Sequence, residues 1–235
     1  MPVNSVILQT MILKLVEKRK ETRSVTSFIF QPENPFKWAA GQYLIYKLAH
    51  ENEDLRGRTR FFTISSSPFE KNPSITTRIT KSSSSFKKAL NSLKPGDIIE
   101  AKGPDGDFVV DSFTKTHVFI AGGIGITPYI SILKQLVKSK KKVRIILFYA
   151  NKNKQIPFKK DLDEISAKDK DIKVNYVLSP RKINSFMLKK HLIPGALYYI
   201  SGPDAMVEDI TRELIKLGVK EKNIKNDYFS GYKSI

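Results

Sequence analysis

The chain has 235 residues, of which 40% are apolar and 14 are Phe, so it can bury one large core or two small ones and is not intrinsically disordered. It contains no Cys, which excludes disulfides, zinc–thiolate sites and an iron–sulfur cluster held by its own thiolates, and with only three widely spaced His we expect no metal site. The net charge of +18 is concentrated in residues 114–235, which carry 24 basic and 11 acidic side chains, against 17 and 12 in residues 1–113.

The hydropathy of the chain and its first ten residues predict a cytoplasmic protein. No apolar stretch reaches the roughly 20 residues that span a membrane, and residues 1–10 lack the pattern of a signal peptide.

The densest basic run, residues 138–144, has no interleaved aromatic residues, and no nucleic-acid-binding motif is evident. We therefore expect a solvated face, or a docking surface for an acidic protein, rather than a nucleic-acid-binding surface.

Residues 1–113 are predicted to form a small antiparallel β-barrel. Short runs of strand-forming residues are separated by turn residues such as Pro95-Gly96-Asp97, and one short helix, Ser85–Leu93, interrupts them. The six predicted strands are Met11–Lys18, Val25–Phe30, Tyr43–Leu48, Arg60–Ile64, Ser74–Thr80 and Ile98–Lys102.

From about residue 114 the pattern alternates between strands and helices, which predicts a parallel sheet with crossover helices. The predicted strands are Thr116–Ile120, Val143–Tyr149, Ile172–Leu178 and Leu197–Ile200. The predicted helices are Thr127–Lys138, Phe158–Ala167, Ser185–His191 and Ala205–Leu217. We therefore expect two domains, 1–113 and 114–235.

Residues 121–128, Ala-Gly-Gly-Ile-Gly-Ile-Thr-Pro, follow a predicted strand and precede a predicted helix. This arrangement aims free N–H groups and the positive end of a helix at a phosphate, and Gly122, Gly123 and Gly125 leave room for a ligand. Pro128 fits the first helical turn. The alternative is a tight turn that binds nothing.

Three further segments favour anion or flavin binding. In residues 60–63, Arg60 can pair with a diphosphate, an aromatic ring can stack on a flavin, and a hydroxyl can reach flavin N5, although a plain strand gives the same pattern. Residues 83–88 place serines and lysines at a helix start, where a simple N-cap is the alternative. Residues 199–206 again read as strand, Gly-Pro turn and helix.

The order of these segments resembles the ferredoxin–NAD(P)⁺ reductase family. Residues 60–63 resemble its Arg-x-Tyr/Phe-Ser/Thr motif, residues 122–128 its Gly-Gly-x-Gly-x-Thr-Pro motif, and residues 201–206 its Cys-Gly-Pro-x-x-Met motif. Residues 38–43 resemble the family's Gly-Gln-Phe/Tyr strand, and residues 94–108 resemble the end of its barrel. Residues 227–232 resemble its C-terminus. The resemblance spans nearly the whole chain.

The resemblance implies an FAD-dependent NAD(P)H oxidoreductase, with an FAD-binding barrel at 1–113 and an α/β NAD(P)-binding domain at 114–235. The residues expected to act in catalysis are Thr63, Ser201 and Asp227. Those expected to bind cofactors in the first half are Arg60, Phe62, Thr63, Ile64, Arg78, Ile79, Ser84, Ser85, Phe86 and Lys87. Those in the second half are Gly122, Gly123, Gly125, Ile126, Thr127, Pro128, Asn151, Lys152, Ser201, Gly202, Pro203, Met206 and Phe229.

Four positions depart from the family pattern. Ser201 stands in place of a Cys beside the nicotinamide, and Phe62 replaces the commoner Tyr. Lys87 stands where the second phosphate motif often has a hydroxyl, and Asp227 replaces a Glu with a shorter reach. The C-terminal aromatic residue that would cover the flavin is Phe229 or Tyr232.

Lys152 and Lys154, with no acidic residue before Asp161, favour NADPH over NADH. Without an iron–sulfur relay, electrons must leave for a separate acceptor, and the positive charge favours an acidic ferredoxin or flavodoxin. The alternatives are a reductase of free flavin, a quinone or a haem protein, a non-catalytic flavin or nucleotide sensor, and, least favoured, a nucleic-acid binder.

Overall fold

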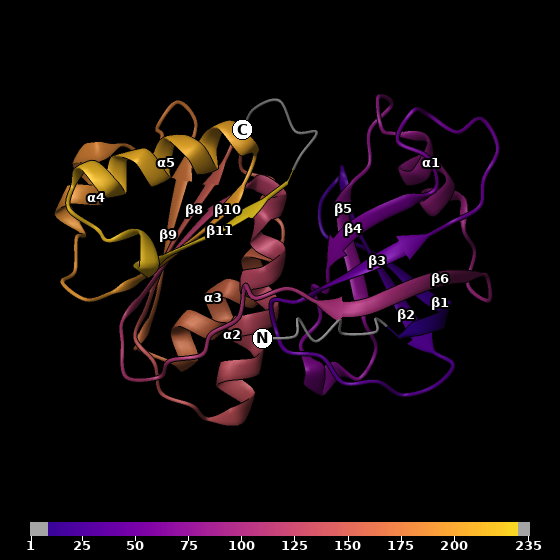
Figure 1. The fold of residues 1–235 in the computed structure, drawn as a ribbon, viewed down its shortest axis with the longest axis horizontal. Helices are drawn as coiled ribbons and strands as arrows, with labels where there is room; N and C mark the ends of the chain where they lie inside the picture. Colours follow the sequence, from indigo (N-terminus) through magenta and orange to yellow (C-terminus); the bar gives the residue numbers. More distant parts are fainter. Residues whose placement is uncertain (1–8, 230–235) are drawn as a thin grey trace, which may run out of the picture.

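The computed structural model describes residues 9–229, in which a β-barrel lies beside a parallel sheet flanked by helices (Figure 1). The barrel strands are β1 (Thr10–Lys20), β2 (Val25–Pro32), β3 (Tyr43–Lys47), β4 (Thr59–Thr63), β5 (Ser74–Arg78) and β6 (Ile98–Asp105). They pair antiparallel in the order β4-β3-β6-β1-β2-β5, and a bridge between Ile64 and Ile75 brings the two edges together. The predicted six-stranded antiparallel barrel is confirmed.

Buried and exposed side chains alternate along the strands, which explains why the strands close around a common core. In β1, Leu13 and Leu15 are fully buried while Lys14 between them is exposed. This period of two puts one face of each strand into a common core. Helix α1 (Ser85–Ser92) contributes Phe86 and Leu90 to that core.

The second half is a five-stranded parallel sheet, which confirms the predicted α/β architecture. Its strands are β7 (His117–Gly122), β8 (Ile145–Asn151), β9 (Ile172–Leu178), β10 (Leu197–Gly202) and β11 (Ile224–Tyr228). Their order is β11-β10-β7-β8-β9. The helices are α2 (Thr127–Ser139), α3 (Lys159–Lys168), α4 (Ser185–Lys190) and α5 (Asp204–Lys216), and the short 3₁₀ helices are η1 (Pro68–Glu70), η2 (Gly123–Ile126) and η3 (Glu221–Asn223).

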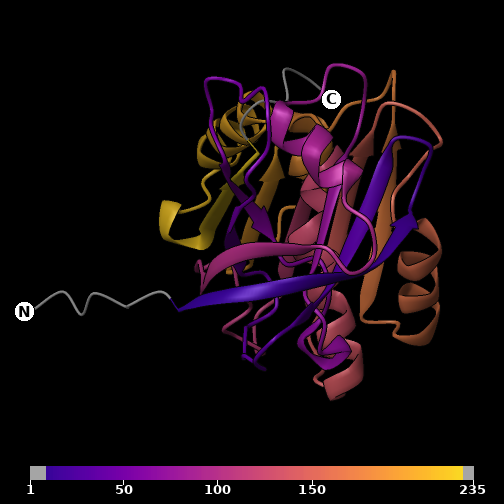
Figure 2. The ribbon, with the colours of Figure 1, turned by 90° about the vertical axis from the view of Figure 1, so that its right-hand side faces the viewer.

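Helices cover both faces of this sheet (Figures 1 and 2). Along β7, Phe119 packs in a core with α2 and α3, whereas its neighbours Val118 and Ile120 pack in a core with α4 and α5. Burial on both faces accounts for the continuous apolar runs that predicted these strands. The domain boundary at residues 113 and 114 stays a prediction.

The fifth strand, β11, was not predicted. Its sequence, Ile-Lys-Asn-Asp-Tyr, has apolar residues only at its two ends, and all of it is half-buried or exposed at the sheet edge. It pairs in parallel with β10 and sets Asp227 beside Ser201. The strand therefore brings two predicted catalytic residues together.

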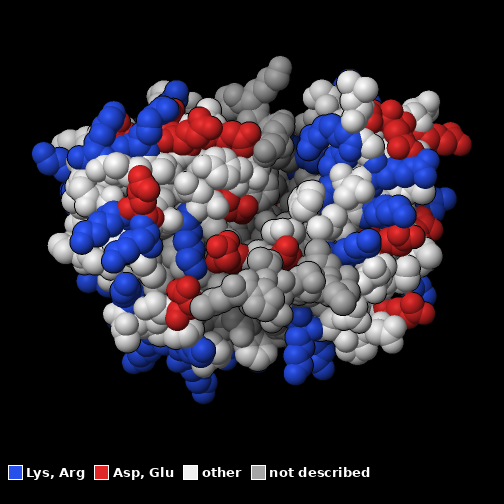
Figure 3. Space-filling model, in the orientation of Figure 1, with Lys and Arg blue, Asp and Glu red and all other residues white. Residues whose placement is uncertain are grey.

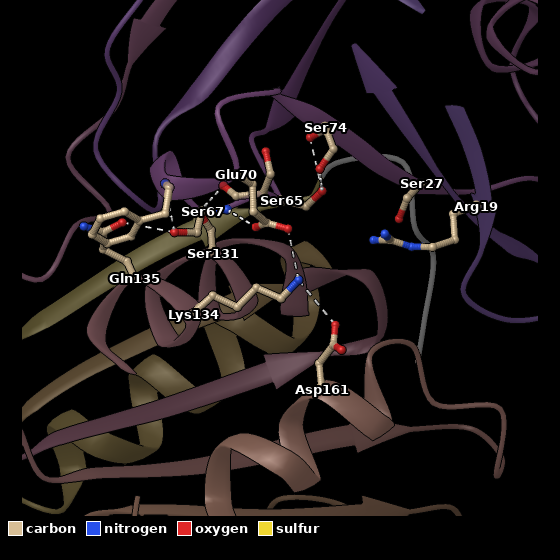
Figure 4. A network of polar contacts seen from close by, with 12 residues as sticks. Arg19, Ser27, Ser65, Ser67, Glu70, Ser74, Ser131, Lys134, Gln135 and Asp161 are labelled. Carbon is tan, nitrogen blue, oxygen red and sulfur yellow. Dashed lines mark hydrogen bonds and ion pairs between the residues drawn. The ribbon is translucent and has the colours of Figure 1, made fainter. Parts of the chain in front are cut away.

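Helix α2 also fixes the barrel against the sheet (Figure 4). The Ser131 hydroxyl donates to the carbonyl oxygen of Ser66 at 2.6 Å, and the Ser67 hydroxyl donates to Gln135 at 3.0 Å. The ammonium of Lys134 lies 3.3 Å from the Glu70 carboxylate and 3.4 Å from that of Asp161. One helix thus serves both the α/β core and the junction with the barrel.

Candidate active site

A cleft of about 960 Å³ is lined by both the barrel and the α/β half. The predicted residues that line it are Arg60, Phe62, Thr63, Arg78, Ser84, Lys87, Gly122, Gly123, Asn151, Lys152, Pro203, Asp227 and Phe229. The predicted residues outside the lining are Ile64, Ile79, Ser85, Phe86, Gly125, Ile126, Thr127, Pro128, Ser201, Gly202 and Met206. Segments far apart in the sequence therefore meet at one site. Tyr232 lies outside the described residues.

On the α/β side, the cleft is bordered by the turn after β7. Gly123 has φ +55°, and no described residue has an atom within 4 Å of the position that a Cβ would take. The Tyr149 hydroxyl donates to the carbonyl oxygen of Gly123 at 3.1 Å and so holds the turn in place. Because a backbone without side chains faces open space here, the turn can accept a ligand closely.

Gly125 is required for packing, not for the cleft. A Cβ on Gly125 would lie 2.3 Å from the carbonyl oxygen of Ser201, so only glycine lets the turn approach β10. Gly122 and Gly123 line the cleft and Gly125 does not, so a role of Gly125 in cofactor binding stays a prediction. Ile126, Thr127 and Pro128 are buried at the start of α2.

At the ends of β10 and β11, the hydroxyl of the fully buried Ser201 donates to the Asp227 carboxylate at 3.1 Å. Burial raises the pKa of Asp227 to about 6, even though the Ser201 hydrogen bond acts in the opposite direction. Asp227 lines the cleft, and the backbone N–H of Phe229 donates to the Gly202 carbonyl at 2.9 Å. A carboxyl group with a raised pKa in a cleft is typical of functional sites.

On the barrel side, Thr63 and Phe62 reach the cleft at the end of β4. Phe62 is nearly buried and its ring packs 5.9 Å from the rings of both Tyr46 and Phe86. Phe61, which was not predicted, is 63% exposed and also lines the cleft. The motif therefore offers one partly enclosed and one open aromatic ring.

The guanidinium of Arg60 is held by the protein itself. One terminal nitrogen donates to the carbonyl oxygens of Arg56, Gly57 and Thr59, and the other donates to the Asp54 carboxylate at 2.9 Å. Arg60 is only 6% exposed. Asp54 and loop carbonyls thus accept hydrogen bonds from both terminal nitrogens, and the expectation that this guanidinium pairs with a diphosphate stays a prediction.

Sequence reasoning missed several residues of the lining: Tyr43, Arg56, Thr59, Phe61, Thr76, Thr77, Thr80, Ser82, Ser83, Ile124 and Tyr228. A signal existed for Thr76, because it is two residues from the predicted Arg78 on β5 and therefore lies on the same face of that strand.

On the side of the molecule drawn in Figure 3, basic side chains lie over both the barrel and the α/β half, with acidic side chains among them.

The cleft fits a nucleotide cofactor. Within the described residues, two buried donors at its walls, Arg60 Nε and Asn151 Nδ2, have no hydrogen-bond partner, and the Gly123 turn stands open. Over residues 9–229 there is no group of three or more His, Cys, Asp or Glu that could hold a metal ion. No helix in that range is long and apolar enough to cross a membrane.

Comparison with known proteins points to the same two cofactors. Residues 12–110 match the family model of the oxidoreductase FAD-binding domain, and residues 119–212 match that of the oxidoreductase NAD-binding domain. Flavohemoprotein A of Dictyostelium discoideum is 29% identical over an alignment of 235 positions, which covers 90% of this chain and 58% of that protein. The chain thus spans less than two thirds of the length of the first curated relatives it matches.

Two solved structures share the fold. The flavohemoglobin of Malassezia yamatoensis, with bound FAD and heme, has a TM-score of 0.80 at 20% identity, over 97% of this chain and 61% of that one. Ferredoxin-NADP⁺ reductase of Plasmodium falciparum has a TM-score of 0.77 at 21% identity, over 94% of this chain and 96% of that one. At this identity the likeness concerns the fold.

Proposed function

Because the chain belongs to the ferredoxin–NAD(P)⁺ reductase-like family of FAD-dependent NAD(P)H oxidoreductases, we propose that it moves a hydride between NAD(P)H and FAD and passes electrons to a separate acceptor. The observation that carries this proposal is the convergence of the Gly122–Gly123 turn, Asp227 and Thr63 on one cleft. The chemistry that FAD supplies when bound is acceptance of a hydride and release of single electrons.

In this proposal the residues of the chain bind and orient the two cofactors. The backbone N–H groups of the Gly122–Gly123 turn bind the diphosphate of NAD(P)H, at the carboxyl edge of the parallel sheet, where such ligands bind. Ser201 and Asp227 form a hydrogen-bonded pair that positions the nicotinamide, and Asp227, with its raised pKa of about 6, can hold a proton in mildly acidic solution. Thr63 presents its hydroxyl, and Phe62 its ring, to the flavin.

Lys152 supports NADPH as the coenzyme. It follows directly after the last residue of β8 and lines the same cleft as Gly123. A base at the end of the second strand of such a sheet suits a 2′-phosphate, and an acid there would suit a free ribose hydroxyl.

For the acceptor, we propose a haem protein ahead of a ferredoxin or flavodoxin. The supporting observations are that curated relatives carry the name flavohemoprotein and that one structural neighbour contains both FAD and heme. The net charge of +18 suits an acidic partner of any of these classes.

The test is steady-state oxidation of NADPH by FAD-loaded protein with ferricyanide, a b-type haem protein, a ferredoxin or free flavin as acceptor. We expect turnover with ferricyanide and, among proteins, the highest kcat/KM with the haem protein, falling as salt is added. No turnover with ferricyanide would contradict the reductase function, and faster reduction of ferredoxin would contradict the choice of acceptor alone.

A further inference from the structure

The strongest anion-binding arrangement on the barrel side of the cleft already contains an anion that belongs to the chain. The Asp54 carboxylate accepts one hydrogen bond from an Arg60 terminal nitrogen at 2.9 Å and one from the backbone N–H of Ser85 at 2.9 Å. Ser85 is the first residue of α1, so this N–H is one of the donors that a helix start leaves free. Asp54 therefore joins the guanidinium to the positive end of the helix.

The contact is reinforced from the loop. The Asp54 backbone N–H donates to the Ser85 hydroxyl at 3.0 Å, and that hydroxyl lies 2.9 Å from Nε2 of His50. Hydrogen bonds from the backbone of Ser85 and Arg56, together with Arg60, lower the pKa of Asp54 to about 2. The residue is therefore ionised throughout the physiological pH range.

A second observation shows that this place is built for an anion. Arg60 is more than nine-tenths buried, and among the described residues its Nε has no hydrogen-bond partner, although both terminal nitrogens donate hydrogen bonds. A buried guanidinium needs an opposite charge, because an unpaired buried cation is strongly destabilising. Carboxylates and phosphates meet that need with the same geometry, so either can pair with Arg60.

Asp54 also lines a second hollow. This hollow has a volume of about 810 Å³ and shares Ser83 and Ser84 with the cleft, and its lining includes His50. Arg60 lines the cleft and Asp54 the second hollow.

On the basis of the function proposed above, we infer that Asp54 occupies the position of the cofactor diphosphate in the flavin-free protein, and that FAD binding displaces it together with residues 49–58. The carboxylate keeps the buried Arg60 paired until the diphosphate replaces it. If the carboxylate stayed, two like charges would share one set of donors, which is strongly unfavourable. Asp54 thus stabilises the empty site and weakens FAD binding.

The test compares Asp54→Asn with Glu53→Gln. Both variants lose one negative charge from adjacent positions of the same loop, but Glu53 pairs with Arg58 and contacts neither Arg60 nor α1 in the described residues. Apoprotein is titrated with FAD, and binding is followed by quenching of flavin fluorescence. We expect the Kd for FAD to fall about tenfold in Asp54→Asn, as removal of a like charge from the site predicts, and to change by less than about twofold in Glu53→Gln.

The melting temperature of each apoprotein gives a readout that does not depend on the loaded enzyme. It should fall in Asp54→Asn and not in Glu53→Gln. An unchanged or raised Kd for FAD in Asp54→Asn, with normal wild-type binding, would overturn this inference and leave the proposed function standing. Lack of FAD binding by all three proteins would overturn both.

If Asp54→Asn fails to fold, hydrogen exchange of the wild-type protein decides. Addition of FAD should speed exchange of the amides in residues 49–58 and slow that of residues 84–88. Slower exchange in residues 49–58 would mean that the loop stays in place, and the inference would be wrong.

Discussion

The two walls of the cleft differ in how far they are ready for a ligand. On the α/β side, as far as residues 9–229 show, the Gly123 turn stands open and the Asn151 amide nitrogen has no hydrogen-bond partner. On the barrel side, the strongest cationic group, Arg60, is already paired with Asp54. Open backbone carries no net charge and costs little to leave uncovered, whereas a buried guanidinium must be paired. The α/β wall is therefore stable without a ligand, whereas the barrel wall needs the Asp54 carboxylate to pair with Arg60.

The largest expected effect separates two glycines of the same turn. Gly125→Ala should lower the free energy of unfolding by about 3 kcal/mol, because its Cβ would lie 2.3 Å from the Ser201 carbonyl. Gly123→Ala should cost only about 1 kcal/mol, for its positive φ. The Gly123 variant should instead lose NAD(P)H affinity, since its methyl group enters the cleft. Urea denaturation and coenzyme titration of both variants measure this. Equal stabilities would contradict the distinction.

The second prediction concerns Asp227 on the open wall. Its folded-state pKa of about 6 lies above the ordinary value of 3.8, so its contribution to stability is complete below about pH 4 and is lost as pH rises through 6. The loss is on the order of 3 kcal/mol. Asp227→Asn should remove this step from a stability profile measured by urea denaturation between pH 4 and 8, and Ser201→Ala should move it to higher pH. Parallel profiles for wild type and Asp227→Asn would contradict the assignment.

The third prediction tests the junction that fixes the two walls relative to each other. Ser131→Ala leaves the buried carbonyl oxygen of Ser66 without this donor and should cost about 1–2 kcal/mol of stability. Ser139→Ala, on the same helix but bonded only to its own turn at Leu136 in the described residues, should cost less than about 0.5 kcal/mol. Thermal or urea unfolding measures both. A Ser131 variant as stable as the Ser139 variant would show that the contact contributes little.

The smallest effect is expected for coenzyme choice. Lys152→Ala should lower the ratio of kcat/KM for NADPH to that for NADH about fivefold, as loss of one exposed charge contact predicts. Lys154→Ala, two residues farther along and outside the lining, is the control. A wild-type enzyme that prefers NADH, or an unchanged ratio in Lys152→Ala, would contradict the role of Lys152.

Local patterns predicted most of the fold. In β1, buried and exposed side chains alternate because one face of the strand is buried, whereas β7 and β8 are continuous apolar runs because both faces are buried. Both patterns can be recognised from consecutive residues in the sequence. The edge strand β11 was not predicted because its side chains are half-buried or exposed, so its sequence shows no regular pattern of apolar residues.

The sequence identified most of the cleft motifs but not their partners. Asp54 meets Ser85 across 31 residues of chain, and Ser201 meets Asp227 across 26. Such contacts follow from how loops and strands pack, not from local spacing. For the same reason the packing role of Gly125 became evident only when β10 was seen against the turn.

The central claim is that the cleft brings FAD and NAD(P)H together for hydride transfer. The most direct measurement is the visible absorption spectrum of FAD-loaded protein under anaerobic conditions, before and after addition of NADPH or NADH. The account predicts a bound flavin spectrum that the coenzyme bleaches. A bound flavin that neither coenzyme bleaches would contradict it.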